Sequence, residues 1–181
     1  MRSDMQRRHF LRQLCVLTLA GLGLPACARS EKANAISEQG SSPIAKLNKP
    51  LSEWHQLLPS QAYAVLFEEA TERPFSSPLN SEKRTGTFIC AACYLPLFES
   101  SAKFESGTGW PSFYQPIKEH ISTKSDYKLL WPRTEYHCIR CGGHQGHVFN
   151  DGPPPTGQRW CNNGVALNFI PTGDLLPALR M

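Results

Sequence analysis

The sequence predicts a mainly β domain made of small antiparallel sheets, with short helices only at its front. From Thr71 onward, proline, glycine and serine recur every few residues between short runs of β-type residues. Helical patterns are confined to the segment just before that point. With 181 residues and 40% hydrophobic content, the chain can bury one ordinary core.

Two short helices are expected at the front of the domain. Ser52 can cap the stretch EWHQLL, and Pro59 opens the stretch QAYAVLFEEA. The large apolar side chains of this second helix share one face: Tyr63, Leu66 and Phe67. The expected strands are GTFIC, YLPLF, SFYQPI, YKLLWP, EYHCIRC, GHVF and VALNFI. The sequence contains no glycine-rich phosphate loop and no dinucleotide-binding fingerprint.

Residues 1–28 are predicted to be an export signal. A basic start is followed by a moderately apolar stretch, 14–24, and then by small residues, which is the order of a secretory signal. The pair Arg7-Arg8 with Phe10 and Leu11 resembles the twin-arginine signal, whose pathway carries folded proteins. An ordinary basic amphipathic helix is disfavoured because residues 13–28 carry no charge. We therefore expect a periplasmic protein.

Two ways of ending this signal stay open. The small residues Ala26 and Ala28 fit cleavage after Ala28. The stretch LPAC also resembles a lipoprotein box, in which Cys27 becomes the acylated first residue and the only membrane anchor. Residues 29–50 are rich in serine, alanine, lysine and asparagine, so we expect a flexible linker there. Residues 51–175 then form the folded domain.

Most of the positive charge belongs to the predicted signal. Of 19 basic and 15 acidic residues, positions 1–28 hold four arginines and one aspartate, which leaves 15 basic and 14 acidic residues. Nucleic-acid binding depends on clustered positive charge, which a near-neutral chain does not suggest. We therefore expect no nucleic-acid partner.

Two cysteine pairs predict a structural metal site. Cys90 and Cys93, like Cys138 and Cys141, have the C-x-x-C spacing, follow β-prone residues and lead into a turn. Two such knuckles can direct four thiolates at one ion, and zinc suits this set because it is redox-inert. Four protein ligands leave no open position, so we predict one structural Zn²⁺. Two disulfides or a redox-active pair are the alternatives, but a bridge across two residues is strained.

Cys161 is the one cysteine after the signal that has no other cysteine three residues away. A free cysteine is usually a small buried hydrophobe. Here, however, Arg159 and Asn163 are close in sequence, and a guanidinium with amide donors would favour the thiolate, the form that attacks. Upstream, His144 and His147 can transfer protons near neutral pH. Together these residues favour an enzyme.

Trp110 lies in a glycine-rich loop, KFESGTGWPSFY. An indole is costly to leave exposed on such a loop, so it either packs in the core or lines a pocket. The spacing alone does not decide between the two.

These motifs resemble one family, the type B methionine-R-sulfoxide reductases. The matching stretches are TERPFSSPLN, GTFICAACYLPLFESSAKFESGTGWPSFYQPI and RTEYHCIRCGGHQGHVFNDGPPPTGQRWCNNGVALNFI, which lie within about residues 52–171. So long an ordered set is more specific than a zinc knuckle alone. The resemblance implies two antiparallel sheets, a structural zinc, and reduction of the R epimer of methionine sulfoxide, free or in oxidised proteins.

The resemblance also implies roles for individual residues. Cys161 matches the nucleophile, which attacks the sulfoxide sulfur and becomes a sulfenic acid. The implied catalytic set is Cys161, His144, His147, Asn163 and Arg159. Trp110 matches the indole that cradles the S-methyl group of the substrate, and Phe149 is the second predicted substrate contact.

Four positions depart from the family pattern. Many members carry a resolving cysteine where this chain has Thr108, Asn150 stands in place of a usual proline, and Trp160 replaces a usual tyrosine. The run CNNG, ending at Gly164, replaces the commoner Cys-x-Asn-Ser. The core of the predicted site survives these changes, but the usual route of recycling does not.

The cysteine count predicts how the enzyme is recycled. Cys15 leaves with the signal and Cys27 is removed or acylated, while four cysteines hold zinc. Cys161 then has no partner within the chain, so we expect a small thiol or a thioredoxin-like protein to reduce it. We expect a monomer. The competing interpretation is a non-catalytic zinc-stapled β module that binds a protein or ligand, for which Cys161 would be dispensable.

Overall fold

The structure is a computed structural model and describes residues 44–181 except Leu130. The predicted export signal, both of its cleavage modes and residues 29–43 of the predicted linker lie outside the described residues. Within the described part of the chain, no helix is long and apolar enough to cross a membrane.

Two short helices open the domain, α1 (Leu51–Leu57) and α2 (Ser60–Glu68). The expected opening of α2 at Pro59 is confirmed, since the Tyr63 amide donates to the Pro59 carbonyl at 2.9 Å. The expected cap at Ser52 is wrong, because α1 begins at Leu51 with Pro50 at its N-cap. There the Pro50 carbonyl accepts the Glu53 amide at 3.0 Å, and no side chain caps the helix.

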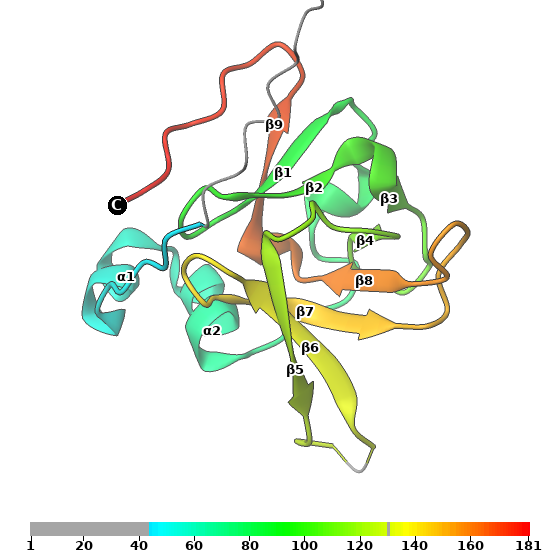
Figure 1. Cartoon of the computed structure of the whole chain (residues 1–181), viewed down its shortest axis with the longest axis horizontal. Helices are drawn as coiled ribbons and strands as arrows, with labels where there is room; N and C mark the ends of the chain where they lie inside the picture. The colour runs from blue at the N-terminus through cyan, green and yellow to red at the C-terminus, as the bar shows by residue number, and fades with distance from the viewer. Residues whose placement is uncertain (1–43, 130) are drawn as a thin grey trace, which may run out of the picture. The chain divides into compact units, whose positions relative to one another are not determined.

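The strands form two antiparallel sheets, as predicted (Figure 1). The smaller sheet has the order β2-β1-β9, with β1 Gly86–Cys90, β2 Pro96–Glu99 and β9 Leu167–Pro171. The larger has the order β3-β4-β8-β7-β6-β5. Its members are β3 Lys103–Phe104, β4 Ser112–Phe113, β5 Ile121–Asp126, β6 Arg133–Cys138, β7 His144–Phe149 and β8 Arg159–Asn162. Single-turn 3₁₀ helices cover Pro78–Ser81, Ser100–Ala102 and Gly164–Ala166.

One expected strand was wrong, and one strand was missed. The run YKLLWP was expected to be a strand, but its described residues connect β5 to β6. The strand instead is β5, sequence ISTKSD, whose polar composition suits an edge strand with exposed side chains. Strand β8, sequence RWCN, was also missed, because it carries polar residues although it lies inside the sheet.

The core lies between the two sheets. Phe98 of β2 stacks on Phe113 of β4 with ring centroids 4.2 Å apart, and Phe88 of β1 meets the same ring edge-on at 4.9 Å. Tyr136 of β6 is fully buried and meets Trp160 of β8 edge-on. Because side chains alternate along a strand, these residues define the core face of the larger sheet.

The neighbours of these core residues along each strand lie on the opposite face of the larger sheet. Cross-strand partners share a face, which the registers Asp126↔Arg133, Glu135↔His147, Ser112↔Cys161 and Phe149↔Arg159 make explicit. One face of this sheet therefore packs the core and the other carries polar and ionisable side chains.

A β-bulge brings His144 to the same polar face as His147. On β6 and β7, His137 pairs with His144 and Tyr136 with Gly146, so Gln145 has no partner in the ladder. Without this extra residue, two histidines three positions apart would point to opposite faces of the sheet. With it, their ring centroids lie 5.5 Å apart.

The packed domain extends beyond residues 51–175 at both ends. The Leu47 amide donates to the Arg140 carbonyl at 2.7 Å. The Arg140 guanidinium donates to the Arg180 carbonyl at 2.6 Å, and the Arg180 amide donates to the Cys93 carbonyl at 3.1 Å. The two flanking segments therefore bind the two cysteine knuckles.

Candidate active site and metal centre

The four paired cysteines meet in one cluster, as predicted. Cys90 ends β1 and Cys138 ends β6, and Cys93 and Cys141 lie in the turns that follow. Both turns close alike, since the Tyr94 amide donates to the Cys90 carbonyl and the Gly142 amide to the Cys138 carbonyl, each at 2.9 Å. Tyr94 and Gly142 both have positive φ, 64° and 73°. The two knuckles are therefore equivalent in geometry.

The sulfur positions fit a metal and not a pair of disulfides. All four Sγ atoms lie within 4.8 Å of one another, and all four cysteines are free. The Cys93–Cys138 and Cys90–Cys141 pairs are 3.5 and 3.7 Å apart, against about 2.05 Å for a disulfide bond. Sulfurs held about 2.3 Å from one tetrahedral ion would lie nearly 4 Å apart. The cluster could hold one metal ion, and the amide of Gln145 donates to Cys90 Sγ at 3.5 Å.

Cys161 lies on β8 between two site residues. Its partner on β7 is His147, and its partner on β4 is Ser112. Gly146 permits this approach of the strands, since a Cβ there would lie 1.9 Å from the Cys161 carbonyl oxygen. A pocket opens over this point, lined by Thr71, Trp110, Arg133, Gly146, His147, Phe149, Cys161, Asn162 and Asn163. Trp110 therefore lines a pocket.

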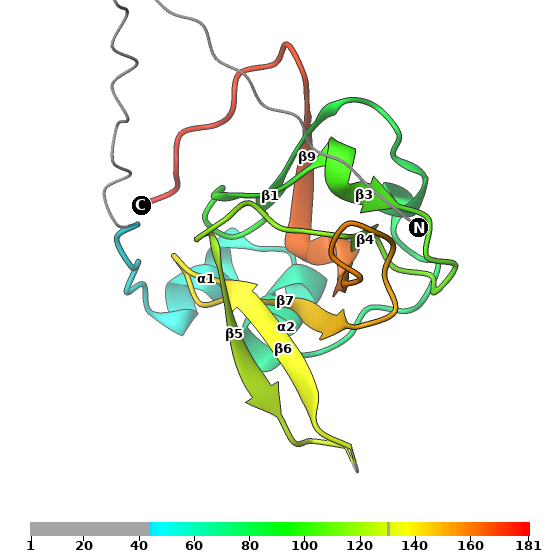
Figure 2. The same ribbon diagram turned by 45° about the vertical axis from the view of Figure 1, so that its right-hand side comes forward.

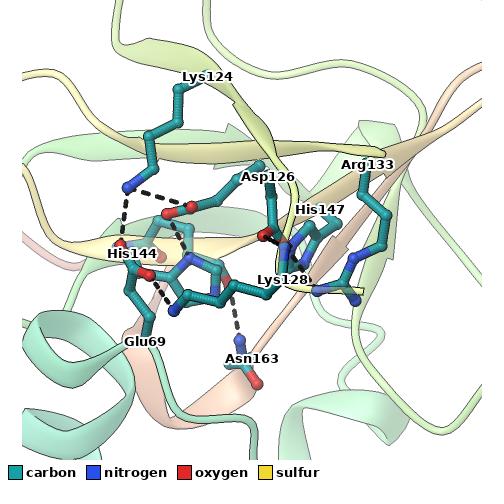
Figure 3. Close-up of polar contacts among 10 residues, drawn as sticks. Glu69, Lys124, Asp126, Lys128, Arg133, His144, His147 and Asn163 are labelled. Atoms are coloured by element: carbon teal, nitrogen blue, oxygen red, sulfur yellow. Dashed lines mark hydrogen bonds and ion pairs between the residues drawn. The ribbon is translucent and has the colours of Figure 1, made fainter. Parts of the chain in front are cut away.

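His147 is held by a buried carboxylate (Figure 3). Its Nε2 lies 2.8 Å from Asp126 Oδ2, and the same oxygen accepts a bond from Arg133 at 2.6 Å. The Lys128 amide, His147 and Arg133 all bind Asp126 and hold its pKa well below the usual range. Burial lowers the pKa of His147 despite this partner. A neutral His147 therefore donates Nε2–H to an ionised Asp126, which leaves Nδ1 as its free acceptor.

His144 has a similar partner but lies deeper. Its Nδ1 is 2.8 Å from Glu135 Oε1, and both side chains are 4% exposed. Burial lowers the pKa of His144. Lys124 pairs with Glu135 at 3.2 Å and with Glu69 at 2.7 Å, and Lys128 also pairs with Glu69 (Figure 3). These two lysines lower the pKa of Glu69 to about 2. His144 supports the site from behind and does not line the pocket.

The protonation of Cys161 differs from what its neighbours predicted. Burial raises the pKa of the Cys161 thiol, which outweighs the lowering by the Arg159 charge and by hydrogen bonds with Thr108 and Arg159. Arg159 is itself engaged by Asp151, with two bonds of 2.8 and 2.9 Å. Its guanidinium also lies 4.2 Å from the Phe149 ring centre. The resting cysteine therefore favours the thiol over the thiolate.

The amides after Cys161 bind the protein framework instead of the thiol. Asn163 Oδ1 accepts the Glu72 amide at 3.0 Å, and Asn163 Nδ2 donates to the Gln145 carbonyl at 3.1 Å. The Glu72 carboxylate accepts the backbone amides of Gly164 and Val165. The Glu72 carbonyl also accepts Trp110 Nε1 at 3.2 Å, so this segment fixes both the loop after Cys161 and the indole.

The departure at Gly164 has a steric reason. A Cβ at this position would lie 1.9 Å from Ser77 Oγ and 3.2 Å from Glu72 Oε1. A serine here would displace Ser77 or the Glu72 carboxylate, so glycine suits the neighbours that this chain has. Trp160 donates its Nε1–H to Gln158 at 3.2 Å. Nothing in the structure explains Asn150.

Sequence reasoning missed four charged residues of the site: Glu72, Asp126, Arg133 and Glu135. Glu72, Arg133 and Glu135 lie within stretches that carried the resemblance, but nothing in the spacing marked them as partners of site residues. Asp126 and Arg133 flank a run that was expected to be a strand. The pairing of β5 with β6 and of β6 with β7 brings Asp126, Arg133 and Glu135 next to the histidines.

Comparison with known proteins finds a matching family and similar proteins. Residues 58–171 match the family described as the SelR domain. The chain is 50% identical over 129 residues to the "Peptide methionine sulfoxide reductase MsrB" of Pseudomonas putida strain W619, covering 71% of this chain and 97% of that protein. It is 50% identical over 124 residues to the protein of the same name from Methanosarcina barkeri, covering 68% and 87%. It is also 50% identical over 127 residues to that from Bradyrhizobium diazoefficiens, covering 70% and 91%.

Proposed function

This chain belongs to the MsrB family of SelR-domain proteins, and from that premise we propose that it reduces the R epimer of methionine sulfoxide to methionine. One observation carries the proposal: Cys161 and His147 are cross-strand partners that line the same pocket as Trp110. A non-catalytic binding module would have no need of a cysteine beside a carboxylate-bound imidazole.

Cys161 is the nucleophile of the proposed reaction. Its sulfur attacks the sulfoxide sulfur and forms a transient sulfur–sulfur bond. The oxygen then passes to Cys161, as both this bond and the sulfur–oxygen bond of the substrate break. The thiol and the sulfoxide thus become a sulfenic acid and a thioether, with no other reactant in this step. The sulfoxide oxygen must be protonated as it leaves, and the thiol that burial favours carries that proton into the reaction.

His147 moves this proton. With Nε2–H bound to Asp126, its Nδ1 accepts the thiol proton as Cys161 attacks and then donates it to the sulfoxide oxygen. The imidazolium that forms between these events is stabilised by the Asp126 carboxylate, which accepts its Nε2–H bond. His144, bound to Glu135 and out of the pocket, acts by supporting His147.

The pocket walls support the proposed selection of one epimer. The substrate methyl group packs against Trp110, with Phe149 as a second aromatic wall. The sulfoxide sulfur then faces Cys161 and its oxygen faces His147. With three substituents fixed, only one epimer leaves the rest of the methionine pointing out of the pocket. Arg159 packs over the ring of Phe149, and its positive charge favours the thiolate form of Cys161. Asn163 holds the loop that follows Cys161.

An external thiol completes the cycle. Two equivalents of thiol return the sulfenic acid to Cys161 and yield one disulfide and one water. Position 108, where many relatives have a resolving cysteine, is Thr108, and the four other cysteines of the described residues form the metal cluster. A small thiol or a thioredoxin-like protein therefore attacks the sulfenic acid directly. Mass spectrometry after one equivalent of sulfoxide should find a trappable sulfenic acid at Cys161, and an internal disulfide there would contradict this route.

The metal of the cluster is zinc, in a structural role. The cluster offers four thiolates and no open position, and zinc bound there neutralises their charge and crosslinks β1 to β6. The chain acts as a monomer in the periplasm, exported by its twin-arginine signal, with Cys27 as the one route to lipid anchoring. Replacing Arg7 and Arg8 with lysine should hold the precursor in the cytoplasm, as cell fractionation would show.

The activity is tested by dithiothreitol-driven reduction of each purified epimer. The wild type should convert the R epimer and leave the S epimer, whereas Cys161→Ser should lose turnover with its melting temperature and zinc content unchanged. Cys93→Ser serves as the matched cysteine control, since it should lose zinc and stability first. Turnover that persists in folded Cys161→Ser would refute the assignment.

A further inference from the structure

The connection between β5 and β6 presents large apolar side chains to solvent. Tyr127, Leu129 and Trp131 are 75, 58 and 81% exposed. Figures 1 and 2 both show this hairpin reaching away from the rest of the domain, with the connection at its outer end. We name these three residues the hairpin patch. Exposed apolar side chains grouped in this way are typical of a surface that binds another molecule.

The hairpin patch adjoins, along the chain, two residues at the pocket of Cys161. Asp126 and Arg133 close the hairpin as Cα partners and as an ion pair of 2.6 Å. Asp126 holds His147, and Arg133 lines the pocket, so the patch lies between two residues of the site. The patch begins one residue from Asp126 and ends two residues from Arg133. At about 3.3 Å per residue, it lies within reach of the first few residues flanking a methionine in an extended peptide.

Charge favours an apolar occupant. The two cations beside the patch are engaged within the chain, since Lys128 pairs with Glu69 and Arg133 with Asp126. The patch therefore attracts an anionic partner only weakly. A partner would instead bind by burying the tyrosine, leucine and tryptophan side chains.

We propose that the hairpin patch binds the apolar residues that flank an oxidised methionine in an unfolded polypeptide. This inference rests on the proposed function, because the bound segment places its sulfoxide at Cys161. Methionines that become exposed by unfolding come from cores, so their neighbours in sequence include apolar residues. The patch gives such segments a contact that free methionine sulfoxide cannot make.

The test compares two substrates in the variant Tyr127→Ser/Leu129→Ser/Trp131→Ser. One substrate is free methionine-R-sulfoxide and the other is an unstructured peptide with leucine and phenylalanine around the same sulfoxide. With dithiothreitol as reductant, kcat/KM for the peptide should fall about five- to thirtyfold, mainly through KM, as loss of interface anchors predicts. The value for the free amino acid should stay within about twofold of wild type. The matched control is Leu175→Ser/Leu176→Ser, which removes exposed leucines of the C-terminal segment and should change neither value.

Binding without turnover separates this inference from the proposed function. A fluorescent form of the peptide should bind Cys161→Ser, and the triple substitution in that background should weaken binding by the same factor. If binding behaves so but the wild type reduces neither substrate, the function fails and the surface stands. Three results would overturn the surface: an equal loss on both substrates, no loss on the peptide, or a loss seen only with a protein reductant. A change from dimer to monomer in the variant would instead assign the patch to a second copy of the chain.

Discussion

Asp126→Asn tests whether His147 needs an ionised partner. The carboxylate accepts bonds from the Lys128 amide at 2.9 Å, His147 at 2.8 Å and Arg133 at 2.6 Å. A hydrogen bond to a charged group contributes about 1.5–3 kcal/mol and a neutral one about 0.5–1.5 kcal/mol. The asparagine should therefore weaken the preference of His147 for the tautomer protonated at Nε2 by about 1–1.5 kcal/mol. This is roughly a tenfold change in the ratio of the two tautomers. It also removes the charge that stabilises the imidazolium, so kcat should fall about 10- to 100-fold.

Glu135→Gln is the matched control for this substitution. It changes the carboxylate of the other imidazole, His144, and leaves Lys124 with Glu69. We expect this variant to lose stability, because a buried charged pair is disturbed, with a smaller loss of kcat. Steady-state kinetics with the R-sulfoxide and thermal melts of both variants give the comparison. If Asp126→Asn keeps kcat within twofold while Glu135→Gln loses it, then His144 and not His147 moves the proton.

Three further outcomes are expected. Purified protein should contain about one zinc per chain, and Cys93→Ser should lower both zinc content and melting temperature, because metal binding is coupled to folding; an unchanged melt would contradict the structural role. Burial lowers the pKa values of His144 and His147, so the unfolded chain binds protons that the folded chain excludes, and stability should fall as pH drops below about 6.5. Urea titrations at pH 7.5 and 5.5 check this, and equal midpoints would refute it. Gln145→Leu should lower the free energy of unfolding by about 1–2 kcal/mol, because it removes the hydrogen bonds of the side-chain amide. The same urea titration measures this, and a stability equal to wild type would contradict it.

The metal cluster was predictable because its information is local. Each C-x-x-C pair builds its own knuckle, and only the meeting of the two pairs needed the fold. The residue proposed as the nucleophile was identified from local sequence too, since Cys161 stood apart from both pairs. The resemblance added His144, His147 and Trp110. Of these, His147 and Trp110 line the same pocket as Cys161.

The charged partners were not predictable because they depend on pairing across strands. Arg133 and Glu135 alternate with the apolar face of β6 and read, from sequence, as an ordinary solvent face. That face is not solvated at Glu135, because β5 and β7 bring Lys124 and His144 against it. The same limit hid the protonation of Cys161, since burial is set by the whole pocket and not by the residues next to it in the chain.

The bulge at Gln145 shows how one residue serves both centres. Gln145 has no partner on β6, and its backbone carbonyl accepts the Asn163 amide at 2.8 Å, just beyond β8. Its side-chain amide donates to Cys90 Sγ and accepts from Asn162. A regular strand would turn His144 away from His147. The register shift therefore aligns the two imidazoles, and the bulged residue itself contacts both the loop after Cys161 and the four-cysteine cluster. Two histidines three positions apart share a face of this sheet only because the strand is irregular.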